Sequence, residues 1–274
     1  MPLYQAIVLA IVQGLTEFLP ISSTAHLTLF PWFLHWQDPG LTFDVALHVG
    51  TLIAVFFYFW RMWLDMVMAA AGRRSGSAPD PEVQHQRMLF WFLVAGTIPG
   101  GIAGYLFEHA AETRFREPVV IGTALIVVAL IMWAGERMQE DVVTAVSRVS
   151  LPDSLVIGVA QAFAVIPGVS RSGITMAAGL FRSMTRETAA RFSFLLSTPL
   201  IAGAALKKAL EIRHEGLAPD MRLPFLVVII VSAVVGYLVI AALLRFLEHR
   251  TFKPFIIYRI ALGVAVLAHA AKWI

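Results

Sequence analysis

Three polar residues interrupt an otherwise apolar stretch near the N-terminus: Gln13, Glu17 and His26. Gln13 and Glu17 are four residues apart, so on a helix their side chains share one face. Pro20 then breaks the helix, and His26 follows in the first turn of a second helical arm. Between them stand hydroxyl residues, a type that favours helix N-caps: Ser22, Ser23 and Thr24. An imidazole at such a break could carry protons or act as a nucleophile.

A second polar break lies in the C-terminal half, in the run Pro167-Gly168-Val169-Ser170-Arg171-Ser172-Gly173. The glycines let backbone N–H groups approach a ligand closely. The helix that starts after the break would offer unpaired N–H donors and a positive dipole end, which suit phosphate. Arg171 adds a planar fork of donors that matches phosphate oxygens, and Ser170 and Ser172 add hydroxyls.

Brought together, the two breaks would form a site for an anion with several oxygens, most naturally phosphate. Glu17 could orient His26, hold a divalent metal ion or pair with Arg171. Simpler interpretations stay open: an Arg–Glu pair could only join the two halves of the chain. Hydroxyl groups in membrane helices often serve only as interhelical hydrogen-bond formers. His48, which stands alone in its segment, is interpreted as a packing residue.

The composition indicates a membrane protein. Of the 274 residues, 58% are hydrophobic and only 14% are charged, and mean hydropathy is +0.76. A soluble domain carries about 25% charged residues. The chain has no cysteine, which excludes disulfides, thiolate catalysis and cysteine metal sites. The net charge of +3 is small, and no basic run with interleaved aromatics predicts nucleic-acid binding.

A membrane-spanning helix needs about 20 predominantly apolar residues. Six segments qualify, and they are predicted as transmembrane helices: 41–60, 88–108, 118–136, 188–206, 223–245 and 254–272. The longest connection, 61–87, has the composition of a loop. The two segments that carry the polar breaks, 3–36 and 152–183, are predicted as re-entrant helical hairpins, because irregular backbone at membrane depth must be buried in protein or line a cavity.

An internal repeat accompanies these hairpins. Residues 12–23 resemble residues 160–171 with a one-residue gap, Gly104-Tyr105-Leu106 recurs as Gly236-Tyr237-Leu238, and residues 114–121 resemble 251–257. Each half then holds one hairpin and three spans, so the second half must be inverted relative to the first. We predict an all-α polytopic membrane protein that is one domain, 1–274, with inverted repeats at about 1–136 and 152–274. Eight simple spans are the alternative, but that arrangement would expose Glu17 and Arg171 to lipid.

Loop lysines and arginines predict the orientation. The larger group lies in the loops at 61–87, 137–151, 182–186 and 245–253, and the smaller group in 109–117, 207–222 and the C-terminus. The first side is therefore assigned to the cytoplasm. Both termini and the mouth of the first hairpin are then expected outside it.

Both breaks resemble the signatures of a known family. Residues 13–26, Gln-Gly-Leu-Thr-Glu-Phe-Leu-Pro-Ile-Ser-Ser-Thr-Ala-His, are similar to the first signature of the undecaprenyl-diphosphatase family, the bacitracin-resistance phosphatases. Residues 167–175 resemble its second signature, and residues 190–196 followed by Pro199 are also similar. Three positions depart from the pattern: Gln13 stands where an acidic residue is common, His48 where a glutamine is expected and Ala25 where a glycine is expected.

The resemblance implies hydrolysis of undecaprenyl diphosphate to undecaprenyl phosphate and inorganic phosphate, which recycles the lipid carrier of cell-wall synthesis and confers bacitracin resistance. It implies a bacterial inner membrane, with the site toward the periplasm or outer surface. Residues matching the family's main functional positions are Glu17, Ser23, His26 and Arg171, with Ser23 or His26 as nucleophile or base. Residues matching its phosphate-binding shell are Gln13, Ser22, Thr24, Ser170, Ser172, Gly173 and Thr175.

Cofactor and partners are less constrained. A divalent cation, Mg²⁺ or Ca²⁺, is expected on Glu17, although an amide at Gln13 binds such ions less well than a carboxylate would. The expected partners are the polyprenyl diphosphate lipid and the membrane, and a homodimer is left open. The rival interpretation is a lipid-phosphate flippase or anion transporter, because inverted repeats with helix ends facing an anion are typical of transporters.

Overall fold

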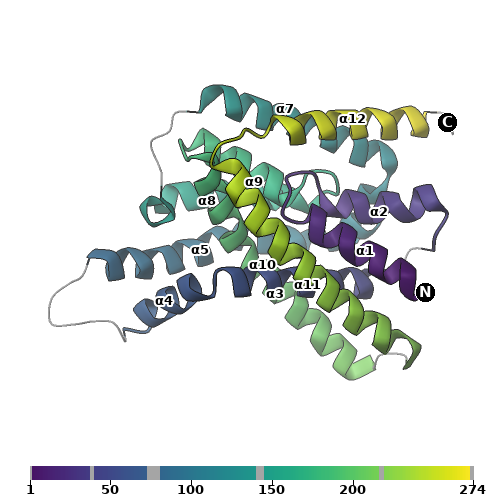
Figure 1. Cartoon of the computed structure of the whole chain (residues 1–274), viewed down its shortest axis with the longest axis horizontal. Helices are drawn as coiled ribbons and strands as arrows, with labels where there is room; N and C mark the ends of the chain where they lie inside the picture. The colour runs from purple at the N-terminus through teal and green to yellow at the C-terminus, as the bar shows by residue number, and fades with distance from the viewer. Residues whose placement is uncertain (1, 38–39, 73–80, 140–144, 216–218, 272–274) are drawn as a thin grey trace.

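The structure is a computed structural model that describes residues 2–37, 40–72, 81–139, 145–215 and 219–271. Every regular element in these ranges is a helix, and the helices lie in layers with α11 crossing the front of the molecule (Figure 1). Five helices are long and apolar enough to cross a membrane. They are α5 (Pro81–Leu106), α7 (Pro118–Met138), α10 (Arg186–Glu215), α11 (Pro219–Leu247) and α12 (Lys253–Ala270). The chain is therefore an all-helical polytopic membrane protein.

The first predicted span and the loop after it differ from expectation. Helices α3 (Leu41–Tyr58) and α4 (Trp60–Ala70) meet at a bend of 76° and count together as a sixth candidate span. The predicted loop 61–87 was wrong at both ends, because α4 occupies its start and α5 already begins at Pro81. Met66 and Ala69, three residues apart, are buried where α4 packs on α5. Charged residues on the other face of α4 hid this apolar stripe in the sequence.

Both predicted hairpins are pairs of short helices around a break. The first consists of α1 (Leu3–Thr16) and α2 (Ser23–Leu34). The second consists of α8 (Leu151–Ala162), the 3-10 turn η3 (Phe163–Val165) and α9 (Arg171–Phe181). Short elements complete the chain: α6 (Glu108–Glu112), η1 (Arg114–Arg116) and η2 (Val146–Arg148). Since every arm is shorter than about 20 residues, none of them spans a bilayer alone.

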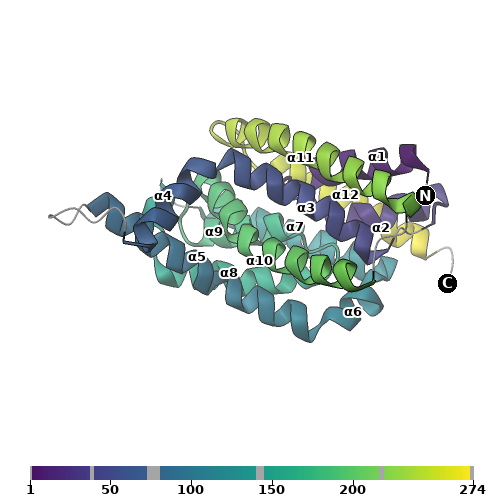
Figure 2. The ribbon, with the colours of Figure 1, turned by 90° about the horizontal axis from the view of Figure 1, so that it is seen from below.

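Equivalent elements of the two halves make equivalent contacts. Helix α1 of the first hairpin packs on α11 of the second half, whereas α8 of the second hairpin packs on α5 of the first half, and α7 packs on α12. Ser22 and Ser170 both cap the second arm of their hairpin. Figure 2 shows the same helices from below, with α1 beside α11. The inverted orientation of the two halves stays a prediction.

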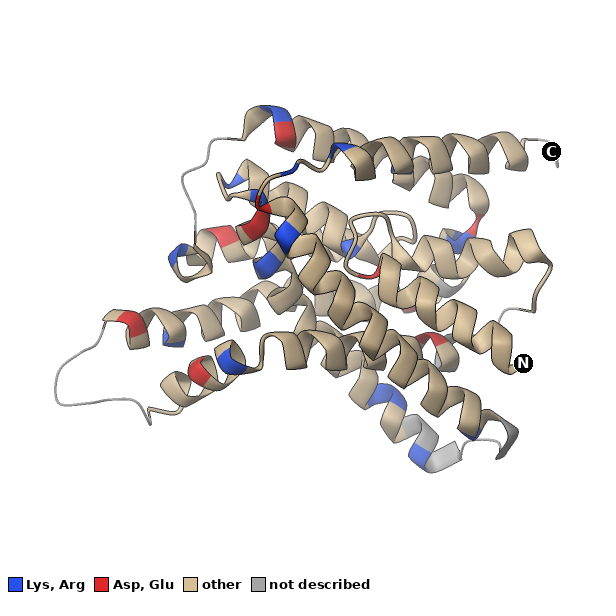
Figure 3. Ribbon diagram, in the orientation of Figure 1, with Lys and Arg blue, Asp and Glu red and all other residues tan. Residues whose placement is uncertain are grey.

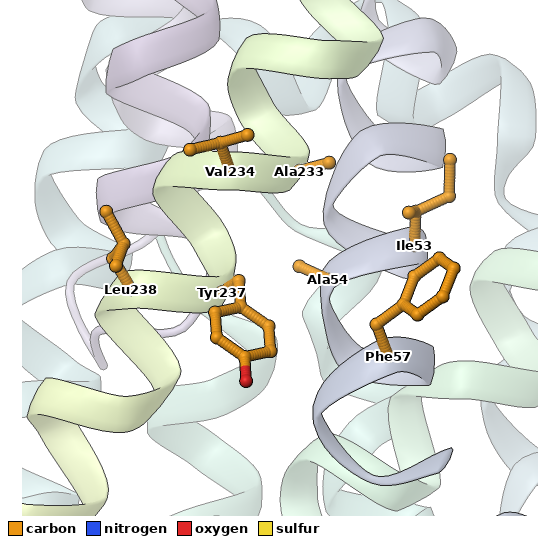
Figure 4. Close-up of a pocket in the computed structure, with 7 residues that line it drawn as sticks. All are labelled: Ile53, Ala54, Phe57, Ala233, Val234, Tyr237 and Leu238. Atoms are coloured by element: carbon orange, nitrogen blue, oxygen red, sulfur yellow. The ribbon is translucent and has the colours of Figure 1, made fainter.

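Small residues allow the closest helix contacts. A Cβ on Gly50 of α3 would lie 1.9 Å from Ser232 Oγ of α11, so only glycine fits. One turn farther along, the two helices part and leave a shallow apolar groove (Figure 4), lined by Ile53, Ala54, Phe57, Ala233, Val234, Tyr237 and Leu238. Charged residues gather mainly toward the helix ends (Figure 3). Several of the buried polar residues lie instead at the hairpin breaks, among them Glu17, Ser23 and Ser170.

Candidate functional site

The two breaks have the same local conformation. Ser22 has φ 77° and Ser170 has φ 68°, the left-handed region that residues other than glycine rarely adopt. Each serine caps the helix that follows, because its hydroxyl accepts a backbone N–H three residues on: Ala25 for Ser22 at 3.4 Å and Gly173 for Ser170 at 3.1 Å. Both buried caps therefore have a strained backbone, and such strained residues cluster at functional sites.

The breaks are bonded to each other. The backbone N–H of Gly168 donates to Ser22 Oγ at 3.1 Å, and Ser172 Oγ donates to the carbonyl of Leu19 at 3.1 Å. Gly168 has φ 95°, and a Cβ there would lie 2.6 Å from the carbonyl oxygen of Ile121, so a larger residue has no room. The N-termini of α2 and α9 therefore meet, as the sequence predicts for a phosphate pocket.

Glu17 lies at the centre of this junction and is 5% exposed. Arg171 Nη2 donates to its Oε1, which joins the two halves by an ion pair. Ser23 Oγ donates to its Oε2 at 2.5 Å, and Gln13 Nε2 donates to the same oxygen at 3.0 Å. His48 Nε2 lies 3.6 Å from that oxygen. The structure thus pairs Glu17 with Arg171 rather than with His26, one of the alternatives that the sequence left open.

His26 is held between a carbonyl and a hydroxyl. Its Nδ1 lies 2.6 Å from the carbonyl oxygen of Ser22, and its Nε2 lies 2.7 Å from the hydroxyl of Tyr258. Because a carbonyl only accepts, Nδ1 carries the proton. In the neutral ring Nε2 is then an acceptor, and the Tyr258 hydroxyl donates to it. The unprotonated nitrogen of His26 therefore faces Tyr258.

The remaining predicted residues lie in the same two breaks with different partners. Thr24 Oγ1 is 3.3 Å from Ser22 Oγ, and Ser170 Oγ is 3.2 Å from Ser172 Oγ. Thr175 instead donates to the carbonyl of Arg171 at 2.7 Å and lies 2.7 Å from Ser193 Oγ. Thr175 therefore hydrogen-bonds within α9 and also joins α9 to α10. Gly173 lies in the first turn of α9, where its N–H meets the Ser170 cap.

The donor atoms around Glu17 do not form a metal site of the protein alone. Both carboxylate oxygens are already engaged, and within the described ranges no group of three or more His, Cys, Asp or Glu side chains could hold an ion. Gln13 Oε1, buried without a hydrogen-bond partner in the described part, is one spare acceptor. Ca²⁺ takes 6–8 oxygen ligands and Mg²⁺ takes about six, so the remaining oxygens would have to come from a ligand.

Three side chains at the site were missed by sequence reasoning. His48 was interpreted as a packing residue, yet it lies beside the Glu17 carboxylate. Tyr258 and Arg259 belong to α12, which carries neither polar motif. Arg259 had a readable signal, because an arginine inside an apolar span faces the protein interior. Tyr258 had none, since an interfacial tyrosine in a membrane helix is common.

Comparison with known proteins finds one family model and several relatives. The family model of bacitracin resistance protein BacA matches residues 6–265. A protein of Pelotomaculum thermopropionicum named undecaprenyl-diphosphatase is 48% identical over 99% of this chain and 98% of its own length. One of Moorella thermoacetica with the same name is 50% identical over 98% of both chains. One of Desulforudis audaxviator, also so named, is 47% identical over 97% of both.

Proposed function

Because the chain belongs to the family of bacitracin resistance protein BacA, we infer that it is an undecaprenyl-diphosphatase. It hydrolyses undecaprenyl diphosphate with water to undecaprenyl phosphate and inorganic phosphate. This recycles the lipid carrier for peptidoglycan and other wall polymers. Bacitracin resistance follows, because the diphosphate lipid that the antibiotic binds is consumed.

The observation that carries this function is the meeting of two helix N-termini with Arg171 inside an apolar bundle. Each N-terminus supplies N–H donors and a positive dipole end. Arg171 has spare donors for phosphate oxygens, because its only other bond to the described residues is a long one of 3.4 Å to the carbonyl of Ser197. In this structure the Glu17 carboxylate pairs with the Arg171 guanidinium, in the place where the substrate anion would bind. The substrate would replace that contact.

We propose Ser23 as the nucleophile and Glu17 as its base. Ser23 Oγ lies 2.5 Å from the Glu17 carboxylate, whereas His26 Nε2 faces Tyr258. When the diphosphate takes Arg171 from Glu17, the carboxylate loses its positive partner and becomes a stronger base for the Ser23 proton. Ser23 Oγ then attacks the terminal phosphorus and the bridging P–O bond breaks, releasing undecaprenyl phosphate.

Water completes the reaction by attacking the phosphoserine, which releases inorganic phosphate and restores the Ser23 hydroxyl. Glu17 returns the proton that it took from Ser23 to Ser23 Oγ as the Oγ–P bond of the phosphoserine breaks. His26 carries the proton of the attacking water. Arg171 stabilises the charge on the phosphoryl oxygens in both steps, the dominant contribution in phosphoryl transfer. We propose that a divalent cation, Mg²⁺ or Ca²⁺, enters with the diphosphate rather than bound to Glu17 alone.

The surroundings of the enzyme are also proposals. We place it in the bacterial inner membrane with the site toward the periplasm or outer surface, following the distribution of loop lysines and arginines. The prenyl tail stays in the bilayer while the diphosphate reaches the breaks. A homodimer is an arrangement that cross-linking in native membranes would detect.

Phosphate release from undecaprenyl diphosphate by the purified protein in detergent tests the function. Arg171→Ala should abolish release while the protein stays monodisperse, and the chelator EDTA should be compared with added Mg²⁺. Arg186→Ala is the control, because Arg186 pairs with Glu136 away from the breaks. Full activity of Arg171→Ala would show that Arg171 is not needed to bind the phosphoryl group. Substrate binding by the wild-type protein without phosphate release would favour a transporter or flippase instead.

A further inference from the structure

Arg259 is the largest fully buried side chain of the molecule's described part, and the proposed reaction does not use it. It lies inside α12 with 0% of its surface exposed. Among the described residues no carboxylate comes within ion-pair distance of its guanidinium. A buried charge without a charged partner is costly unless hydrogen bonds satisfy it. Its partners therefore indicate what it is for.

All of these partners are backbone carbonyls, and they belong to three separate segments. Nη1 donates to Pro20 at 3.1 Å, in the first break. Nη2 donates to Gly168 at 2.8 Å and to Val169 at 3.1 Å, in the second break. Nε donates to Leu125 of α7 at 3.2 Å. One planar group thus holds both breaks against α7.

The breaks create the need for this group. Carbonyls at helix ends lose their intrahelical partners, and no water replaces them in an apolar bundle. The fixed fork of a guanidinium can donate to several acceptors that lie in different directions. Nη1 also packs beneath the first turn of α9, where a Cβ on Gly173 would lie 3.2 Å from it. Moving Arg259 would therefore shift Pro20 and Gly168 relative to each other.

We propose that Arg259 is a positioning residue for phosphate binding. It fixes the N-terminus of α2 relative to the N-terminus of α9, so that their N–H donors and Arg171 face one phosphoryl group. Its positive charge lies directly behind the two helix starts. It acts through the backbone of Pro20, Gly168 and Val169. This role rests on the proposed function, since it assumes that the breaks bind phosphate.

Arg259→Lys separates charge from geometry. The lysine keeps the positive charge, but its ammonium is a single point that cannot reach the carbonyls of both breaks in the same way. Arg259→Met removes the charge and keeps a long side chain. The matched control is Arg186→Lys. Arg186 lies outside the site, and its guanidinium donates two hydrogen bonds of 2.8 and 2.9 Å to Glu136, which the variant would lose.

Each variant is purified in detergent, and only the monodisperse fraction is assayed with undecaprenyl diphosphate. We expect kcat/KM of Arg259→Lys to fall about a hundredfold, the cost of a displacement near 1 Å. KM and the inhibition constant of inorganic phosphate should both rise, because the phosphate donors no longer converge. Arg186→Lys should leave all three values unchanged. A loss of folded molecules alone would lower kcat and leave KM and the inhibition constant as they were.

Binding is measured independently by the rise in melting temperature that inorganic phosphate produces. Wild-type protein should show this rise, and Arg259→Lys and Arg259→Met should lose it. The proposal is overturned if Arg259→Lys keeps the wild-type KM and phosphate-dependent rise, or if neither variant yields folded protein, since Arg259 would then serve the fold alone. Wild-type protein that is stabilised by phosphate but releases none from the lipid would refute the proposed function and leave this inference testable.

Discussion

The hydroxyl of Tyr258 lies 2.7 Å from Nε2 of His26, and the two rings are parallel within 9°. The carbonyl of Ser22 fixes the proton on Nδ1, so this hydroxyl covers the nitrogen that could accept a proton. His26 therefore bonds to Ser22 and Tyr258 and not to Glu17. In the proposed reaction, a proton would reach His26 by way of the Tyr258 hydroxyl.

Tyr258→Phe should lower kcat and leave KM little changed. The phenyl ring keeps the stacking, and only the hydroxyl that connects His26 to the pocket is lost. Acid–base groups contribute about 10²–10⁴-fold, so we expect a loss of kcat toward the lower end of that range. Steady-state phosphate release measures it. Tyr237→Phe is the control, because Tyr237 is 44% exposed and Tyr258 is 42% exposed. Wild-type kcat in Tyr258→Phe would exclude proton transfer through the Tyr258 hydroxyl.

Ser23→Ala tests the nucleophile. Loss of the attacking oxygen should lower kcat by about 10³-fold or more, as removal of a nucleophile does in other hydrolases. Ser154→Ala is matched in size and burial, and within the described ranges the Ser154 hydroxyl bonds only the carbonyl of Phe92. That control should keep its activity. If Ser23→Ala retains activity within about tenfold, Ser23 orients Glu17 and the attacking group is another.

Gln13→Glu addresses the metal requirement. The substitution places a second carboxylate four residues before Glu17, on the same face of α1. Two buried like charges repel each other unless a cation lies between them. We expect the variant to lose activity in EDTA and to reach half-maximal activity at about tenfold lower Mg²⁺ than the wild-type protein, since a direct ligand is gained. An unchanged Mg²⁺ titration would mean that the cation does not approach position 13.

The sequence predicted the parts of the fold whose signal is local. Long apolar stretches identified the five spans and the first part of the bent sixth candidate, and hydroxyl residues after Pro20 identified the first cap. It failed where the signal was mixed: α4 combines an apolar stripe with charges and was predicted as a loop. The roles given to the site residues stay predictions, although the structure brings Glu17, Ser23 and Arg171 together.

The sequence motifs could not predict the site residues that other helices contribute. His48, Tyr258 and Arg259 reach the breaks only because α3 and α12 pack beside the hairpins. Their contacts with Glu17, His26 and Pro20 depend on tertiary packing, over a sequence distance of up to 239 residues for Arg259 and Pro20. No spacing rule for a helix or a strand covers such contacts.

The strained cap at Ser22 gives a prediction about stability. Ser22 combines φ 77° with a hydroxyl that accepts from both Gly168 and Ala25. Ser22→Ala keeps the strain and leaves the buried N–H of Gly168 without a partner, a cost of about 1–3 kcal/mol. Ser22→Gly loses the same acceptor but relieves left-handed strain of about 1–2 kcal/mol, against about 0.5–1 kcal/mol for the extra chain entropy of glycine, so it should recover part of that cost. Thermal unfolding in detergent should therefore rank wild type, glycine and alanine in decreasing order.

Ser183 supplies the control for that ranking, because it also has a positive φ, 58°, but lies in the turn after α9, away from the breaks. There the glycine variant should melt above the wild-type protein, since relief of strain is the main effect. An order at Ser22 with glycine above wild type, as at Ser183, would show that the hydroxyl contributes less than the strain costs. The link between the two breaks would then depend on Arg259, on the Glu17–Arg171 pair and on the bond from Ser172 to the carbonyl of Leu19.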